Sequence, residues 1–374
     1  MSLRSQVTGF GLRLAIWTCN LRRRAIDPLV VIGLNAVIVA VTEETPRILT
    51  VKRADHSLAA ELKHFVKDVF QAESPDAIPF GPFDPASDRT LELGLRRWVR
   101  EQTGLELGYV EQLYTFGDRN RDPSECEGGP RVISVAYLAL VREGKPSGTA
   151  GANWREWYLF FPWEDWRAGR PKVIEKHIAP VLHRWVNAVS EQRIRQERQE
   201  RSDINFGLNG APWVPERVLE RYELIYEVQL AIEASRDRGP RNSEPTFSSA
   251  KQNNRPPLWT QRLGQPMALD HRRILATALG RLRGKLKYRP VVFELLPSAF
   301  TLLQLQRVVE ALAGVRLHKQ NLRRLVETGG LVEGTSQFDQ RTGGRPAELF
   351  RFRRDVLRER PAPGVGLPGI RQPG

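Results

Sequence analysis

Two β-branched apolar runs near the start of the chain form its first clear pattern. Leu29–Val41 and Arg47–Lys52 are rich in Val and Ile, and turn residues at 42–46 separate them. This arrangement predicts two strands joined by a turn. Residues 109–116 and 132–141 carry similar runs on either side of a polar loop. The first two hundred residues therefore predict a mixed sheet with helices between its strands.

Helical spacing of apolar positions marks several further elements. Leu91, Leu95 and Val99 share one helical face, and Gly104 supplies a stop directly after them, so we expect a helix at 90–103. The same reasoning predicts other elements before the last hundred residues: helices at 58–69, 172–201 and 215–238, and a short strand at 158–162. Six Trp and Phe side chains between 154 and 166 suit core packing or base stacking, and we favour core packing.

The last hundred residues follow a distinctive order of elements, after a Pro- and Ser-rich predicted linker at 239–266. Asp270 and Thr301 are placed to cap two helices, and Gly314 is placed to end the second one. The predicted order is a helix at 270–286, a strand at 289–296, helices at 302–313 and 319–327, and strands at 331–333 and 349–352. This is the order of a winged helix-turn-helix, which binds DNA.

Hydrogen-bond donors gather where such a fold meets DNA. Arg and Asn side chains read guanine and adenine edges in the major groove, and the third helix supplies candidates for this role. Thr301 is a candidate phosphate contact at the start of the second helix, and the wing loop offers a Gly pair between two arginines. The predicted DNA-binding residues are Thr301, Lys319, Gln320, Asn321, Arg323, Arg324, Arg341, Gly343, Gly344 and Arg345.

Charge supports the same interpretation. The chain has 57 basic and 43 acidic residues, a net charge of +14, with a pI near 10.2. Residues 271–354 alone hold 17 basic and 6 acidic side chains, a net charge of +11. A basic surface alone indicates only attraction to polyanions, but its coincidence with the winged-helix pattern favours DNA.

Other classes of protein find little support. The two cysteines, Cys19 and Cys126, lack metal-ligand spacing and indicate a reduced compartment without a disulfide framework. No apolar run has the length of a membrane span, and the arginines at 22–24 follow the apolar stretch instead of preceding it as in a signal peptide. We expect a cytoplasmic protein with a loose extension at 1–27.

Residues 81–105 (GPFDPASDRTLELGLRRWVREQTGL) are similar to a Nudix box. Aligned from Gly104, the segment keeps Arg97, Val99, Glu101, Gly104 and Leu105. It has Arg89, Trp98 and Gln102 where the family has Glu, and Phe83 in place of the opening Gly. Nudix hydrolases hold Mg²⁺ on the box carboxylates, and Mg²⁺ requires several hard oxygen ligands. The resemblance therefore implies a Nudix fold without catalytic residues or a metal site.

A nucleotide pocket is the remaining expectation for this region. The helix of the box contributes Arg97 and Glu101, and the polar loop contributes Asp118, Arg119 and Arg121. The two loop arginines are suited to pair with a pyrophosphate. For each loop residue, plain solvent exposure is the alternative.

The flanking segments 112–123 and 134–141 look like those of ADP-ribose-type Nudix domains. Together with the C-terminal pattern, the layout resembles the Nudix-related regulators of NAD biosynthesis. This resemblance implies a homodimeric repressor of NAD metabolism genes on a palindromic operator. It implies an adenine nucleotide effector (NAD, ATP or ADP-ribose), no required cofactor and no membrane partner. The alternatives are an active Nudix pyrophosphohydrolase with an accessory nucleic-acid-binding module, and a non-catalytic RNA-binding or scaffold protein.

The predicted fold class is α+β, with a Nudix-like mixed-sheet α/β/α sandwich followed by a helical connector and a winged helix-turn-helix. The predicted boundaries divide the chain into an extension, a sensor, a connector with a flexible linker, a DNA-binding domain and a disordered tail: 1–27, 28–200, 201–266, 267–356 and 357–374.

Overall fold

The computed structural model describes most of the chain in several stretches: 30–52, 75–119, 121–122, 125, 129–148, 151–234, 263–340, 346–360 and 362–365. Four predicted features lie outside these residues, wholly or for the most part: the extension at 1–27, the helix at 58–69, the linker at 239–266 and the wing tip at 341–345.

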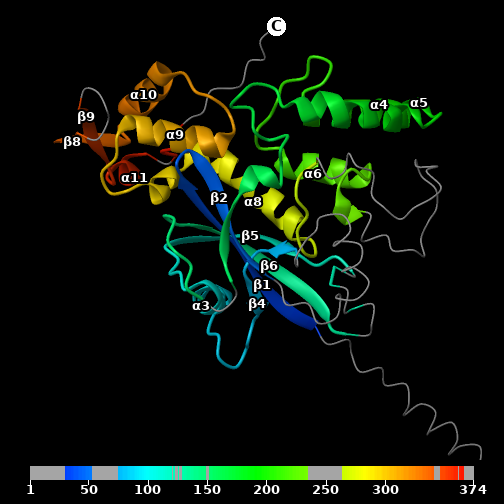
Figure 1. The fold of residues 1–374 in the computed structure, drawn as a ribbon, viewed down its shortest axis with the longest axis horizontal. Helices are drawn as coiled ribbons and strands as arrows, with labels where there is room; N and C mark the ends of the chain where they lie inside the picture. Colours follow the sequence, from blue (N-terminus) through cyan, green and yellow to red (C-terminus); the bar gives the residue numbers. More distant parts are fainter. Residues whose placement is uncertain are drawn as a thin grey trace, which may run out of the picture.

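A mixed β-sheet forms the centre of the molecule (Figure 1). Its strands run in the order β3–β2–β1–β6–β5, while β4 pairs with β1 and β7 pairs with β2. The pair β1–β6 is parallel and the other pairs are antiparallel. The strands are β1 (Val30–Thr42), β2 (Thr45–Lys52), β3 (Asp76–Ala77), β4 (Phe80–Pro82), β5 (Tyr109–Phe116), β6 (Arg131–Leu140) and β7 (Asn153–Glu156).

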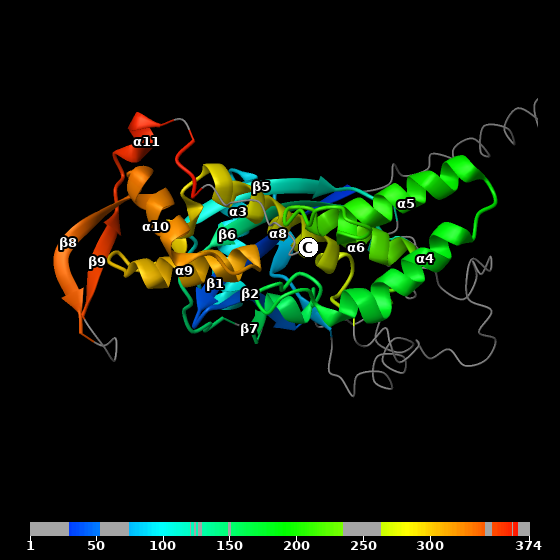
Figure 2. The same cartoon turned by 90° about the horizontal axis from the view of Figure 1, so that it is seen from above.

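Helices cover both faces of this sheet. On one face, α3 (Leu91–Thr103) packs Leu95 and Val99 against alternate residues of β1. On the other face, α8 (His271–Tyr288) crosses β1, β5 and β6 (Figures 1 and 2). These layers confirm the predicted α+β class and the α/β/α sandwich. Gly104 ends α3 as predicted, in the left-handed region at φ +72°, and the Thr90 side chain caps its start.

The middle of the chain differs from the prediction of two long helices. The segment at 172–201 is not one helix, because it contains a π-helical turn at Ile174–Ile178 and a break at 188–191. Pro180 follows the π turn and has no N–H for an α-helical bond to residue 176. The helices here are α4 (Ala179–Asn187), α5 (Gln192–Phe206) and α6 (Val218–Glu227), the last much shorter than the predicted 215–238.

The predicted strand at 158–162 is wrong. A strand does form just before it, at Asn153–Glu156, and a 3-10 turn (η2, Trp157–Leu159) follows. Trp157, Phe160, Phe161 and Trp163 are all fully buried, which a two-faced edge strand does not allow. Their burial confirms core packing as the role of these four aromatic side chains.

The C-terminal elements follow the predicted order with two corrections. The strand expected at 289–296 is a 3-10 helix (η5, Val291–Leu295) that starts after Pro290. The described part of the tail expected to be disordered from 357 instead forms α11 (Val356–Glu359) and buries Val365, whose N–H donates to the Leu286 carbonyl; residues 361 and 366–374 lie outside the described residues. The remaining elements are α9 (Leu302–Ala313), α10 (Lys319–Thr328), β8 (Val332–Asp339) and β9 (Ala347–Phe352).

One hydrophobic core joins these parts. It contains Val37 of the sheet, Trp163 of the middle region, Leu279 of α8 and Leu312 of α9. The elements α10, β8, β9 and α11 lie at one end of the molecule and α4–α5 at the other (Figure 2). The predicted domain boundaries remain predictions, although α8 belongs to the sandwich as much as to the segment that follows it. Of the helices described, none is both long and apolar enough to cross a membrane.

Candidate DNA interface and effector region

The helix-turn-helix is built by α9 and α10. Thr301 and Gln304 form a reciprocal capping box at the start of α9, and Gly314 ends the helix at φ +73°. Phe300 exchanges two backbone hydrogen bonds with Phe350, which fixes the start of α9 against β9. Leu322 and Val326 bury one face of α10, so the opposite face points to solvent.

The exposed face of α10 carries the predicted recognition residues. Arg323 donates to Glu327 at 2.8 Å, one turn further along. Within the described part of the chain, Arg324 has no side-chain hydrogen bond or ion pair. The following five predicted recognition residues are all exposed: Lys319, Gln320, Asn321, Arg323 and Arg324. DNA contact by these residues remains a prediction.

Thr301, the predicted phosphate contact, is buried at the start of α9. It is 5% exposed, and its hydroxyl oxygen accepts from the Gln304 N–H at 3.1 Å. Thr301 is therefore a helix cap, and contact of its hydroxyl with a phosphate remains a prediction.

The wing is the β8–β9 hairpin, with Val332 opposite Phe352. Both strands extend beyond the predicted 331–333 and 349–352. The four predicted wing residues, Arg341, Gly343, Gly344 and Arg345, lie outside the described residues.

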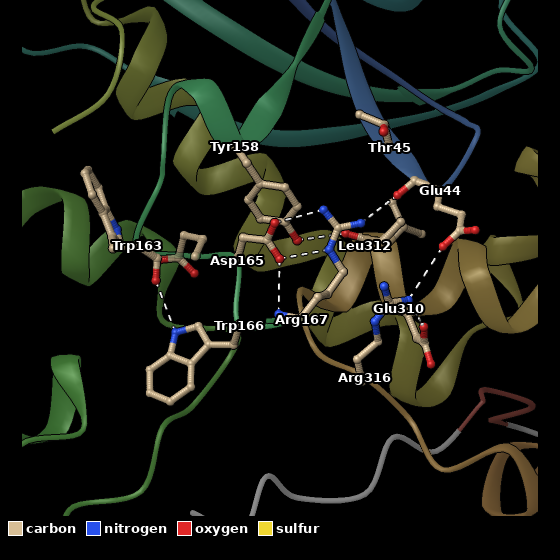
Figure 3. A network of polar contacts seen from close by, with 12 residues as sticks. Glu44, Thr45, Tyr158, Trp163, Asp165, Trp166, Arg167, Glu310, Leu312 and Arg316 are labelled. Carbon is tan, nitrogen blue, oxygen red and sulfur yellow. Dashed lines mark hydrogen bonds and ion pairs between the residues drawn. The ribbon is translucent and has the colours of Figure 1, made fainter. Parts of the chain in front are cut away.

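Two further cations of the helix-turn-helix were not among the predicted residues. Arg307 of α9 and Arg316 of the turn both contact Glu44 at the β1–β2 turn, at 3.0 and 3.6 Å. Figure 3 shows Glu44 beside Arg316, with Glu310 as a second acceptor. The sequence could have suggested both residues, because Arg307 lies in the predicted second helix and Arg316 in the turn after it.

The Nudix-like box helix holds its arginine against a carboxylate. Arg97 makes a two-pronged contact with Asp88, at 3.0 and 2.9 Å, and lies 3.5 Å from Glu101. The hydrogen bond from Arg97 holds the pKa of Asp88 below its ordinary value. Sequence reasoning missed Asp88, the buried carboxylate that orients Arg97.

The positions that lost their carboxylates bind the backbone instead. Trp98 donates its indole N–H to the Pro82 carbonyl at 2.7 Å. The Gln102 amide bonds both to the N–H of Phe80, at 3.2 Å, and to its carbonyl, at 2.5 Å. Both side chains therefore fasten α3 to β4. Among the described residues, no group of three or more metal-binding side chains is placed to hold an ion.

The polar loop makes contacts that the pocket prediction did not anticipate. The Arg121 side chain is 3% exposed, forms a two-pronged contact with Asp270 at 3.0 and 2.5 Å, and donates to Ser134. Arg121 is thus paired within the protein and buried, and its contact with a pyrophosphate remains a prediction. Asp270, the predicted cap of α8, makes no capping hydrogen bond because Arg121 holds its carboxylate.

The neighbouring loop residues differ from Arg121. Asp118 pairs with Arg273 of α8, which also contacts Glu223 of α6. Arg119 is exposed. The loop therefore connects the sheet to the first turns of α8 and leaves Arg119 as the arginine open to solvent.

A separate cavity of about 260 Å³ lies between α4 and α5. It contains none of the predicted effector residues. Its polar side chains are largely engaged within the protein: Arg170 donates to the Gly207 carbonyl, and Ser202 donates to the Arg198 carbonyl. The cavity thus does not coincide with the predicted pocket.

A buried ion network connects the middle region to the helix-turn-helix. Glu164 accepts from Arg221 at 2.5 and 2.8 Å and from Arg283 at 2.5 Å, and all three side chains are at most 1% exposed. Arg283 also donates to the Leu312 carbonyl of α9. Tyr158 donates to the Ala311 carbonyl of the same helix. The orientation of α9 relative to the sheet is therefore fixed by buried polar contacts as well as by apolar packing.

Parts of the chain are similar to known proteins. Residues 292–352 match the model of the NrtR DNA-binding winged helix domain. The "ADPR responsive transcriptional repressor NtrR" of Acinetobacter baylyi is 39% identical over 92 residues, which are 25% of this chain and 36% of that protein.

Among solved structures, Shewanella oneidensis NrtR complexed with a 27mer DNA aligns with a TM-score of 0.49 and 19% identity, over 87% of this chain and 95% of that one. A MutT/nudix family protein from Enterococcus faecalis aligns with a TM-score of 0.45 and 14% identity, over 92% and 94%. Residues 292–352 are therefore similar to the winged helix domain of NrtR proteins.

Proposed function

We propose that the protein is a DNA-binding transcriptional repressor whose winged helix is controlled by a nucleotide on the Nudix-like part. The carrying observation is the match of 292–352 to the NrtR winged helix, with an α10 face that exposes Lys319, Arg323 and Arg324. Arg reads guanine edges, and Asn321 beside it suits adenine. The target genes we propose are those of NAD metabolism.

Selection of bound fragments from genomic DNA, followed by footprinting, tests this function. We expect protection of a discrete palindrome, with an affinity that falls steeply as salt rises. Salt-sensitive binding without sequence preference would contradict a repressor and would favour a general nucleic-acid-binding protein.

The effector we propose is an adenine nucleotide, and ADP-ribose is the first to test because the A. baylyi relative is named for its response to it. NAD and ATP are the other candidates. Glu101 of α3 and Arg119 of the polar loop are exposed, whereas Arg121 is paired with Asp270. Arg97 stays a candidate because its side chain is 34% exposed, although its guanidinium group is paired with Asp88.

We propose that the Nudix-like part is not a hydrolase. Trp98 and Gln102, in place of two box carboxylates, are engaged with the backbone of β4. Incubation with ADP-ribose, NAD or ATP and Mg²⁺ is the test. Turnover near an ordinary enzymatic rate of ~1–10³ s⁻¹ would favour the pyrophosphohydrolase alternative.

A homodimer is the assembly we propose, since a palindromic operator matches a two-fold symmetric protein. Sedimentation equilibrium in the presence and absence of operator DNA measures it. A monomer on a single half-site would contradict this proposal.

A further inference from the structure

The tip of the β1–β2 hairpin has an unusual backbone for its residues. Thr42 pairs with Thr45, so Glu43 and Glu44 form a two-residue turn, and both have positive φ, at +48° and +66°. Such turns favour Asn-Gly because ordinary side chains are strained there, at a cost of roughly 1–2 kcal/mol each. Two glutamates at this position therefore indicate a role for the side chains themselves.

The Glu44 carboxylate lies on the helix-turn-helix. It contacts Arg307 of α9 at 3.0 Å and Arg316 of the turn at 3.6 Å. The backbone of Glu44 is held independently, because its carbonyl accepts from Arg167 at 2.6 Å (Figure 3). Arg167 is in turn fixed by two 2.8 Å contacts with Asp165. The hairpin tip is thus positioned without help from the carboxylate.

The ion pairs of Glu44 are of the weak, reversible kind. Its side chain is 34% exposed, and those of Arg307 and Arg316 are 48% and 59% exposed. Exposed pairs contribute little to stability and are screened by salt. In a helix-turn-helix, the first helix crosses the DNA backbone, so cations on α9 and in the turn lie where phosphates pass.

We propose that Glu44 is an electrostatic latch that competes with DNA phosphates for Arg307 and Arg316. This inference rests on the proposed DNA-binding function. With the latch closed, Glu44 offsets the charge of Arg307, and together with Glu310, which lies 2.7 Å from Arg316, it offsets the charge of Arg316. DNA opens the latch by offering phosphates in place of the carboxylate.

Glu44→Gln tests the latch, and Glu43→Gln is the matched control. Glu43 is the adjacent residue of the same turn, so Glu43→Gln removes the same charge as Glu44→Gln. The ion pairs of Arg307 and Arg316 at this turn are with Glu44 and not with Glu43. The probe is a short DNA duplex of arbitrary sequence, titrated at several salt concentrations. We expect Glu44→Gln to bind roughly two- to ten-fold tighter at low salt, with a steeper salt dependence, and Glu43→Gln to stay near wild type.

A second variant identifies the arginines as the targets. In an Arg307→Gln/Arg316→Gln background, Glu44→Gln no longer tightens binding if the latch exists. Equal or weaker binding of Glu44→Gln relative to Glu43→Gln would overturn the latch and leave the DNA-binding function standing. Failure of the wild type and all variants to bind any duplex would overturn the proposed function, and the latch with it.

Discussion

Two side chains of α3 explain how the box helix stays in place without the carboxylates of a Nudix box. Gln102 forms two hydrogen bonds with the backbone of Phe80, and Trp98 forms one with Pro82. The bond with the Phe80 carbonyl requires an amide donor, which a glutamate lacks. At the residue scale, the metal ligands have thus been exchanged for attachments between α3 and β4.

Reversal of this exchange is expected to destabilise the protein. In Gln102→Glu the carboxylate faces the Phe80 carbonyl without a donor, which we expect to cost roughly 1–3 kcal/mol. Urea unfolding at neutral pH measures the loss. Arg100→Gln on the same helix is the control, since its ion pair with Glu106 is largely exposed. Equal stability of both variants would contradict the role of the amide.

The Asp88–Arg97 pair predicts a pH dependence. The lowered pKa of Asp88 means that its contribution to stability is present above the ordinary Asp pKa of ~3.9 and is lost as the pH falls through the lowered value. We expect Arg97→Gln to raise the Asp88 pKa toward the ordinary value, as measured by NMR titration of the carboxyl carbon. Arg100→Gln, which removes a largely exposed ion pair with Glu106, is expected to leave it unchanged.

Elements with local signals were predicted closely from the sequence. The starts of α3 and α9 carry Thr caps, and glycines in the left-handed region end both helices. The predicted strands at 158–162 and 289–296 were wrong because tertiary contacts determine the structure there. Both regions contain a 3-10 helix, η2 or η5, with buried apolar side chains, and a short apolar run does not distinguish such a turn from a strand. The partners of the site residues were missed for the same reason. Arg97 pairs with Asp88, which is 9 residues away, and Arg121 pairs with Asp270, which is 149 residues away.

The two neighbouring arginines of α10 are expected to differ in their effect. Among the described residues, Arg324 has no side-chain hydrogen bond or ion pair. Arg323 must break its contact with Glu327 before it can bind DNA. We expect Arg324→Ala to lose roughly 1–3 kcal/mol of discrimination between operator and mismatched DNA if it reads a base. Arg193→Ala on the distant α5 is the control. Uniform weakening on all sequences would identify Arg324 as a phosphate contact instead.

At the scale of the whole molecule, the buried ion network and the shared core make one folding unit of the described parts. Glu164 compensates two fully buried guanidinium groups, one from α6 and one from α8. A buried pair adds little stability over apolar packing, but loss of one partner leaves uncompensated charge. The network therefore favours one relative arrangement of sheet and helix-turn-helix over others.

Glu164→Gln is expected to destabilise the molecule by ~3–5 kcal/mol. Because the core is shared, tryptophan fluorescence and far-ultraviolet circular dichroism should report a single coincident unfolding transition in the wild type. Glu175→Gln, whose side chain is 67% exposed, is the control and should match the wild type. Two separate transitions in the wild type would contradict the single unit.

The central claim, that a nucleotide controls DNA binding through this shared core, is tested most directly by operator affinity. The measurement is a titration of the full chain on its footprinted palindrome with and without ADP-ribose, NAD or ATP. We predict that one of these nucleotides changes the affinity by about 5- to 150-fold, the usual range of allosteric coupling, without being consumed. Unchanged affinity with all three nucleotides, or Mg²⁺-dependent turnover of any of them, would contradict the account.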